Sequence, residues 1–499
     1  MKILKNNIGK IFEFLGYLIV FVPMMFCIYY AVPASDDFAA ASRVDGGNIF
    51  SQSVYRGFSM WADWGGRWLS QIIQMLINPL NSHQHLGHKY GIYMIVVFLV
   101  TTWLTIYGLK AIAKRVLGKE SKYVNLVTFL IIALLYSTYY YSECFNFYIG
   151  AMVYPIPVAL AFVTIAAMIY YNDRPEKKTK YYWIMVVAGI FPATIETCDV
   201  LLGITYLYYI YYLNWNERKS ESIKLKIKHL FPLLLYIALG VSCVLSPGNF
   251  ARREYYKEYY NLESSFMRSL IQTIIDIVVR LQDLVVDHPL AVILLILFII
   301  IGIVSNKELK KPTRVVETAL LFIIITFGAM LPYVYGRDFR NTYLDIRMEY
   351  ILDYCIEIGL ALMCIYLGQW LAYKFDISFT GKEKVGVTAA LLMFAYVTLI
   401  QNYAYLDVVQ VDIIRNRGLI QESYNFWDGV MLEIENSDED DVVIYRDKIL
   451  PWSRYCFEMG LTDGDTYAVD PSIVYDREFI MPNVYYGKKS ITLYYRNHD

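Results

Sequence analysis

Charged residues are scarce in this sequence. Only 18% of its 499 residues are Asp, Glu, Lys or Arg, whereas 57% are hydrophobic, and the mean hydropathy is +0.38. A soluble domain usually has about 25% charged residues. The composition therefore excludes an ordinary soluble enzyme and predicts a polytopic membrane protein. The net charge of −1 adds little, because in such a protein the placement of charge matters more than its sum.

The motifs of soluble catalysts and of cysteine-based metal sites are also absent. The seven cysteines show no Cys-x-x-Cys spacing, so we expect thiols in the core rather than disulfides or metal ligands. We find no glycine-rich phosphate loop, no Gly-x-Ser-x-Gly elbow and no obvious internal repeat. The basic N-terminus leads into an apolar run without a small-residue cleavage site, which indicates a retained first helix.

Hydrophobic runs recur along most of the chain. They predict an all-α membrane domain over residues 1–402, with about 11 helices long enough to cross roughly 30 Å of hydrocarbon. We expect these helices near residues 12–32, 91–109, 123–141, 151–171, 181–196, 200–215, 230–246, 289–305, 315–333, 348–371 and 385–402.

Lysine and arginine are concentrated in alternate connections, at residues 110–122, 174–180, 218–228, 307–314 and 374–384. If every run crosses once, these connections share one side, which the positive-inside rule makes cytoplasmic. We therefore expect a cytoplasmic N-terminus and an extracytoplasmic C-terminus. The short basic loops leave no room for a nucleotide-binding domain, so function should reside on the outer face.

The long segments fall on that outer face, at about residues 33–90, which we call the first long loop, 247–288, 334–347 and from 403 onward. Residues 36–46, 48–78 and 264–287 mix apolar and polar residues at helical spacing, as in Trp64, Trp68 and Ile72, and predict helices lying in the membrane interface. The tail, residues 403–499, combines an acidic cluster with alternating strand-like runs at 442–445 and 491–495. It predicts a small α+β extracytoplasmic domain.

Acids and arginines gather near the outer ends of the runs, where charge is costly unless it pairs or faces a cavity. The acids are Asp36, Asp37, Glu143, Glu196 and Asp199, and the arginines are Arg67, Arg252, Arg253, Arg337, Arg340 and Arg347. Such a set suits displacement at a phosphate-linked carbon, because a carboxylate can accept the proton of an attacking hydroxyl and guanidinium groups can hold the departing phosphate.

Structural roles, without any part in catalysis, are also open to the same residues. Asp36 or Asp37 can cap an interfacial helix while its neighbour faces the cavity. Arginines anchor in lipid headgroups, and most of the 9 tryptophans and 47 tyrosines fit an interfacial belt. His83, His85 and His88 leave a divalent metal open as a cofactor, although a wet interfacial loop explains them better.

Four short segments carry a resemblance to a known group. They are SDDF (Ser35-Asp36-Asp37-Phe38), WGGR (Trp64-Gly65-Gly66-Arg67), IGAMVYP (residues 149–155) and SPGN (Ser246-Pro247-Gly248-Asn249). With an acidic pair after the first run, the chain resembles the GT-C superfamily of integral-membrane glycosyltransferases. More closely, it is similar to a bacterial family of membrane proteins of unknown function related to O-antigen-type glucosyltransferases.

This resemblance covers about residues 1–402 and implies a function. A sugar would pass with inversion from a polyprenyl-phosphate donor to a cell-envelope acceptor, in a bacterial plasma membrane and without nucleic acid. Asp36 or Asp37 would be the base, and the phosphate contacts would fall on Arg67, Arg252, Arg253, Arg337 or Arg340. Substrate contacts are expected from Trp64, Glu143, Tyr154, Glu196 and Asn249. The adjacent acids depart from an Asp-x-Asp pattern, so a metal role is not implied.

Three other functions fit the sequence less well. A transporter or flippase of lipid-linked saccharides predicts charges near mid-membrane and symmetric halves. A polymerase of surface glycan uses closely related chemistry, and a non-catalytic envelope-assembly protein is the remaining alternative.

Overall fold

A computed structural model describes residues 2–42, 47–216, 223–260, 265–306, 312, 315–337, 344–377, 408–446, 453–456 and 481–495. These residues are mostly helical, with a two-stranded sheet near the C-terminus. Within them, 5 helices are long and apolar enough to cross a membrane, or up to 6 if the bent pair α14 and α15 forms one span. By this measure the chain is a multi-pass membrane protein.

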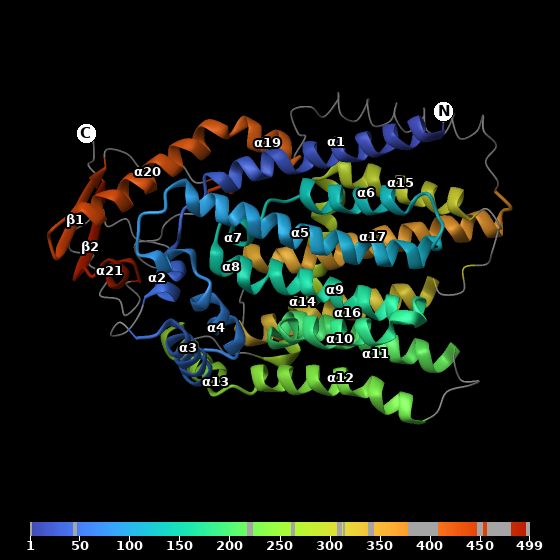
Figure 1. Cartoon of the computed structure of the whole chain (residues 1–499), viewed down its shortest axis with the longest axis horizontal. Helices are drawn as coiled ribbons and strands as arrows, with labels where there is room; N and C mark the ends of the chain where they lie inside the picture. Colours follow the sequence, from blue (N-terminus) through green and yellow to red (C-terminus); the bar gives the residue numbers. More distant parts are fainter. Residues whose placement is uncertain are drawn as a thin grey trace.

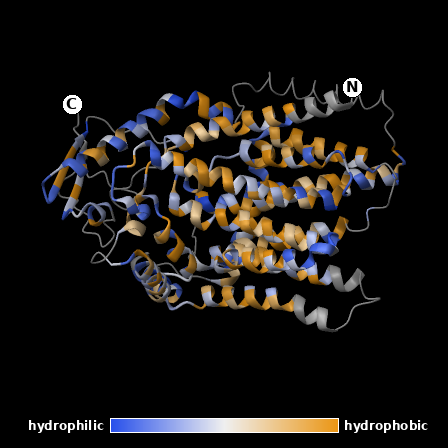
Figure 2. Cartoon of the chain, in the orientation of Figure 1, coloured by the Kyte–Doolittle hydropathy of each residue, from blue (hydrophilic) through white to orange (hydrophobic). Residues whose placement is uncertain are grey.

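Long helices run roughly side by side along the longest axis of the molecule (Figure 1). They are α1 (Lys2–Tyr29), α5 (His88–Leu117), α6 (Val124–Ser137), α9 (Pro155–Asp173), α10 (Lys178–Ile190), α11 (Glu196–Asn216), α12 (Ile223–Val244), α15 (Pro289–Ser305), α16 (Val315–Arg337) and α17 (Ile346–Lys374). Hydrophobic residues dominate this bundle (Figure 2). Every predicted run coincides with one of these helices except residues 385–402, which lie outside the described part of the chain.

Short helices gather at the end of the bundle opposite the N-terminus, which we call the loop end (Figure 1). They are α2 (Ser35–Ala41), α3 (Ile49–Asp63), α4 (Trp68–Leu76), α7 (Ser142–Phe145), α8 (Tyr148–Val153) and α13 (Pro247–Tyr260). Short 3-10 turns are η1 (Pro79–Ser82), η2 (Pro175–Lys177) and η3 (Pro192–Thr194). The helices predicted in the first long loop are therefore present. The predicted helix at 264–287 is α14 (Phe266–Val286), which meets α15 at 90°.

The tail forms α19 (Val409–Arg415), α20 (Arg417–Asn436), β1 (Asp441–Arg446), α21 (Met481–Tyr486) and β2 (Ser490–Tyr495). The two strands pair in parallel, at the positions that the alternating pattern predicts. Val442 and Ile444 of β1 and Leu493 of β2 are buried on one face of the sheet, in a cluster with Trp427. The tail also contacts the bundle, because the Gln410 amide donates hydrogen bonds to backbone carbonyls of α1 and α6.

The cysteines lie where the composition indicates. All seven are free, and five of them are buried, including Cys27 and Cys144 in the core that joins α1, α5, α6 and α17. They pack there among aromatic and aliphatic side chains, as free cysteines in hydrophobic cores usually do.

Candidate functional site

The acidic pair lies in the first turn of α2. Asp37 is completely buried, whereas Asp36 is exposed. Asp37 is the third residue of this helix and helps to cap it, because its Oδ2 accepts a hydrogen bond from the amide of the N-cap residue Ala34 at 3.1 Å. One acid therefore caps the helix, as predicted, while the cavity-facing role predicted for its neighbour stays a prediction.

Two further donors reach Asp37 from other parts of the chain. The Tyr90 hydroxyl of α5 donates to Oδ2 at 2.7 Å, and the Ile149 amide at the start of α8 donates to Oδ1 at 3.0 Å. Burial raises the pKa of Asp37 to about 7, although the three donors favour its ionised form. Asp37 thus joins α2, α5 and α8 and is shielded from any incoming substrate.

Asp36 lies near a half-buried arginine of α3, Arg56. The Arg56 guanidinium donates to the Ala39 carbonyl at 2.9 Å and to the Gln71 side chain at 3.2 Å. Burial lowers the pKa of Arg56, and the negative charge of Asp36 opposes this shift. Arg56 therefore connects α2, α3 and α4 and stabilises the charged form of the exposed acid.

The WGGR and SPGN segments dock against each other. Asn249 of SPGN accepts from the Gly66 amide at 3.2 Å and donates to the Cys243 carbonyl at 2.8 Å. A Cβ atom on Gly66 would lie 1.7 Å from that carbonyl oxygen, so only glycine fits. A Cβ on Gly248 would lie 2.5 Å from the backbone nitrogen of Gly65. The chain thus brings together two backbone segments more than 180 residues apart.

Arg67 is held in a fork between Glu196 and Tyr154. Its Nε lies 2.9 Å from one Glu196 carboxylate oxygen, its Nη2 donates to the other, and its Nη1 donates to the Tyr154 hydroxyl at 3.2 Å. Burial raises the pKa of Glu196, the first residue of α11, but the charge of Arg67 more than offsets this and holds it at about 2. Three of the predicted site residues therefore meet as an ionised pair with a tyrosine.

The arginines of α13 lie beside this pair. The charge of Arg252 also lowers the pKa of Glu196, and a Cβ on Gly65 would lie 3.7 Å from Arg252 Nη1. Arg253 is exposed and stacks over the Tyr335 ring at 5.8 Å. Trp64 packs edge-on against Tyr255 of the same helix, with 5.8 Å between ring centroids. Neither arginine is buried, so both remain accessible to an anion.

Glu143 pairs with an arginine from the start of α17. Arg347 Nε lies 3.4 Å from the Glu143 carboxylate, and Arg347 Nη2 lies 3.0 Å from Asp345. The Tyr333 hydroxyl donates to the same Asp345 carboxylate. Arg347 also interacts electrostatically with Tyr154, which places this second ion pair next to the Arg67 cluster.

Helix α8 connects the two halves of the site. Its first turn binds Asp37 through the Ile149 amide, and its C-terminal cap is Tyr154, which binds Arg67. The five residue steps from Ile149 to Tyr154, at about 1.5 Å per residue, give a separation of about 7.5 Å along the helix. The acid pair and the Arg67 cluster are therefore neighbours at the loop end but do not touch through these contacts.

Two of the predicted phosphate ligands lie beyond what the structure describes. Arg340 lies outside the described residues, and of Arg337 only the backbone, at the end of α16, is described.

The three histidines of the first loop do not converge. His83 stacks on Tyr485, His85 pairs with Asp428 at 3.0 Å, and His88 stacks between two tyrosines of α1 and α20. Among the described residues, no group of three or more His, Cys, Asp or Glu side chains is arranged to hold a metal ion.

One charged cluster was not predicted from the sequence. Arg280 of α14 binds the buried Asp353 of α17 through Nε at 2.7 Å, and the Tyr141 hydroxyl also donates to Asp353. One turn further along α17, the buried Glu357 accepts from Thr138 at 2.7 Å. Acids inside an otherwise apolar run are the signal that could have revealed this cluster.

No family model, no curated protein and no solved structure matches this chain.

Proposed function

We propose that the chain is an inverting glycosyltransferase of the membrane, which moves a sugar from a polyprenyl-phosphate donor to an extracytoplasmic cell-envelope acceptor. One observation carries the proposal. The SDDF, WGGR, IGAMVYP and SPGN segments are linked to one another by direct contacts at the loop end, through Asp37 to Ile149, Arg67 to Tyr154 and Gly66 to Asn249. An accessible acid and accessible arginines flank this linked unit.

The proposed reaction assigns separate tasks to these groups. An acceptor hydroxyl attacks the anomeric carbon of the donor sugar, and Asp36 takes the hydroxyl proton as general base. The bond between the anomeric carbon and the phosphate oxygen breaks, and polyprenyl phosphate leaves with the bonding electron pair. Arg252 and Arg253 stabilise the departing phosphate, because guanidinium groups keep their charge and bind phosphate through paired hydrogen bonds.

Arg67 receives a positioning role in this proposal. Its guanidinium is occupied by Glu196 and Tyr154, and its side chain is 24% exposed. The ion pair sets the position of the WGGR turn, against which Arg252 packs.

A transfer assay tests the proposal. Purified protein is given a radiolabelled polyprenyl-phosphate sugar and a cell-envelope acceptor extract, and wild type is compared with Asp36→Asn and Asp37→Asn. We expect Asp36→Asn to lose transfer by about 10²–10⁴-fold, the usual contribution of a general base. Transfer by Asp36→Asn at the wild-type rate would show that another group is the base.

One observation favours a second candidate, a transporter of lipid-linked saccharides. Glu357 follows Ile346 at the start of α17 by eleven residues, or about 16 Å of helix, which is near the middle of a roughly 30 Å hydrocarbon core. Transporters place charges at this depth. If wild-type protein in vesicles moves the labelled donor across the membrane but transfers no sugar, the transporter is the correct assignment.

A further inference from the structure

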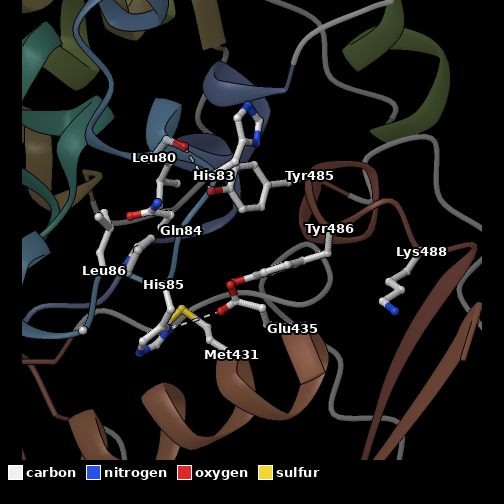
Figure 3. Close-up of a pocket in the computed structure, with 12 residues that line it drawn as sticks. Leu80, His83, Gln84, His85, Leu86, Met431, Glu435, Tyr485, Tyr486 and Lys488 are labelled. Atoms are coloured by element: carbon white, nitrogen blue, oxygen red, sulfur yellow. Dashed lines mark hydrogen bonds and ion pairs between the residues drawn. The ribbon is translucent and has the colours of Figure 1, made fainter. Parts of the chain in front are cut away.

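A cavity of about 220 Å³ lies between the first long loop and the tail (Figure 3). The loop contributes Pro33, Leu80 and residues 83–87 to its wall. The tail contributes residues of α20 and α21 and Lys488. Two segments more than 300 residues apart in the sequence thus form the wall of one partly open cavity.

Aromatic and hydrogen-bonding groups share the wall of this cavity. Tyr485 and Tyr486 come from α21, and Figure 3 shows Tyr486 lying beside Glu435 of α20. Gln84 offers an amide, Lys488 an ammonium group and Glu435 a carboxylate. The charges are of both signs, so the cavity does not select for an anion.

Contacts with the first long loop and with α2 hold the aromatic wall in place. The Tyr485 hydroxyl donates to the Leu80 carbonyl at 3.0 Å, and its ring stacks on His83 with 5.4 Å between centroids. Tyr486 packs edge-on against Tyr485 at 5.0 Å, and Phe38 of α2 contacts both rings. A wall fixed in this way needs little ordering when a ligand binds.

We propose that this cavity binds one sugar ring of the acceptor saccharide. A sugar ring has an apolar C–H face that packs on an aromatic ring and hydroxyl groups that pair with amide, carboxylate and ammonium groups, which together are the groups of this wall. The volume is below the roughly 300–1,000 Å³ of sites for drug-sized ligands, so it suits a single ring rather than a peptide or a lipid chain.

The position of the cavity agrees with this role. Pro33 in its wall precedes Asp36 by three residues, which span at most about 11 Å even when fully extended. A saccharide anchored there can extend a neighbouring hydroxyl toward Asp36. The identification of the bound sugar as the acceptor rests on the proposed function, whereas the binding of a sugar ring does not.

Binding is measured by saturation-transfer difference NMR on the full chain in nanodiscs. The probes are the methyl glycosides of glucose, galactose, N-acetylglucosamine and rhamnose, with inorganic phosphate as an anionic comparison. We expect at least one glycoside to bind, Tyr486→Phe to keep this binding, and Tyr486→Ala to weaken it by up to about tenfold through the loss of ring stacking. Tyr445→Ala is the matched control, because Tyr445 is a half-exposed tyrosine of β1 that does not line the cavity.

Three outcomes overturn the proposal: binding of no glycoside, selective binding of phosphate, or equal glycoside binding by wild type and Tyr486→Ala. The transfer assay separates this result from the proposed function. If Tyr486→Ala loses glycoside binding but transfers sugar at the wild-type rate, the cavity does not hold the acceptor and the transferase assignment stands. If wild type binds glycosides but transfers no sugar, the transferase assignment fails and the sugar site stands.

Discussion

Replacing Asp37 by asparagine distinguishes a structural acid from a chemical one. Asp37 accepts hydrogen bonds at both carboxylate oxygens, from the Ala34 and Ile149 amides and the Tyr90 hydroxyl. Asparagine has one acceptor oxygen, so its amide nitrogen must face either the Ala34 or the Ile149 amide. One backbone N–H then loses its partner in a site from which water is excluded.

The size of this effect follows from the burial of the site. An unsatisfied buried donor costs about 1–3 kcal/mol. Asp36 is exposed, and exposed substitutions usually change the free energy of unfolding by less than about 0.5 kcal/mol. We therefore expect Asp37→Asn to destabilise the protein clearly and Asp36→Asn to leave its stability close to that of wild type, the reverse of their expected effects on the chemical step.

Thermal unfolding in detergent with a thiol-reactive dye measures the difference, because five cysteines are buried in the folded chain and become reactive when it unfolds. We expect the Tm of Asp37→Asn to fall by several degrees and that of Asp36→Asn to stay within about one degree of wild type. An equal fall in both variants, or none in Asp37→Asn, would refute the assignment of Asp37 as the structural acid.

The remaining predictions concern pH and the docked segments. Burial raises the pKa of Asp37 from 3.8 to about 7, so the native state holds this proton more tightly, and the resulting stability is complete below pH 4 and is lost as pH rises through 7. Between pH 5 and 8 the Tm of wild type should therefore fall more than that of Asp37→Asn, by an amount equivalent to on the order of 2–3 kcal/mol; parallel curves would contradict this. Gly66→Ala should prevent folding, because the new Cβ would collide with a backbone carbonyl, whereas Gly203→Ala, with open space around the position, should elute as a normal monodisperse peak in size-exclusion chromatography. Glu196→Gln should lower the Tm by the equivalent of about 1–3 kcal/mol, which is less than the cost of breaking a fully buried ion pair. Adding Arg67→Met to Glu196→Gln should recover part of the lost stability, because no unpaired charge is then left. If the stability losses of the two single variants simply add in the double variant, the two side chains are not coupled.

Much of the fold was predictable because it depends on local patterns. An apolar run of about 20 residues predicts a helix wherever it occurs, and the period-two alternation at residues 442–445 and 491–495 predicted both strands. The parallel pairing of those strands was not predictable, because each needs a partner that lies almost 50 residues away.

The sequence predicted which residues gather at the candidate site, but it did not predict which of them form ion pairs with one another. Charge at the outer ends of the runs selected Arg67, Glu196 and Glu143. Nothing local joins Arg67 to Glu196, which follows it by 129 residues, or Glu143 to Arg347. The Arg280–Asp353 pair was overlooked for a different reason: the mean hydropathy of α17 stays high even though Asp353 and Glu357 lie within it.

Because Asp36 and Asp37 are adjacent in one helix, their side chains point in different directions. Successive residues of a helix point about 100° apart, because 3.6 residues complete one turn. Once Asp37 faces inward to bind Ala34 and Ile149, Asp36 cannot face the same point. A pair spaced in this way is poorly suited to hold one metal ion between its carboxylates, and it is well suited to divide two tasks. The buried acid fixes α2 against α5 and α8, and the rigid turn then presents the exposed acid to whatever enters at the loop end. In the proposed reaction the base needs both a fixed position and access to its substrate; Asp37 provides the first requirement and Asp36 the second.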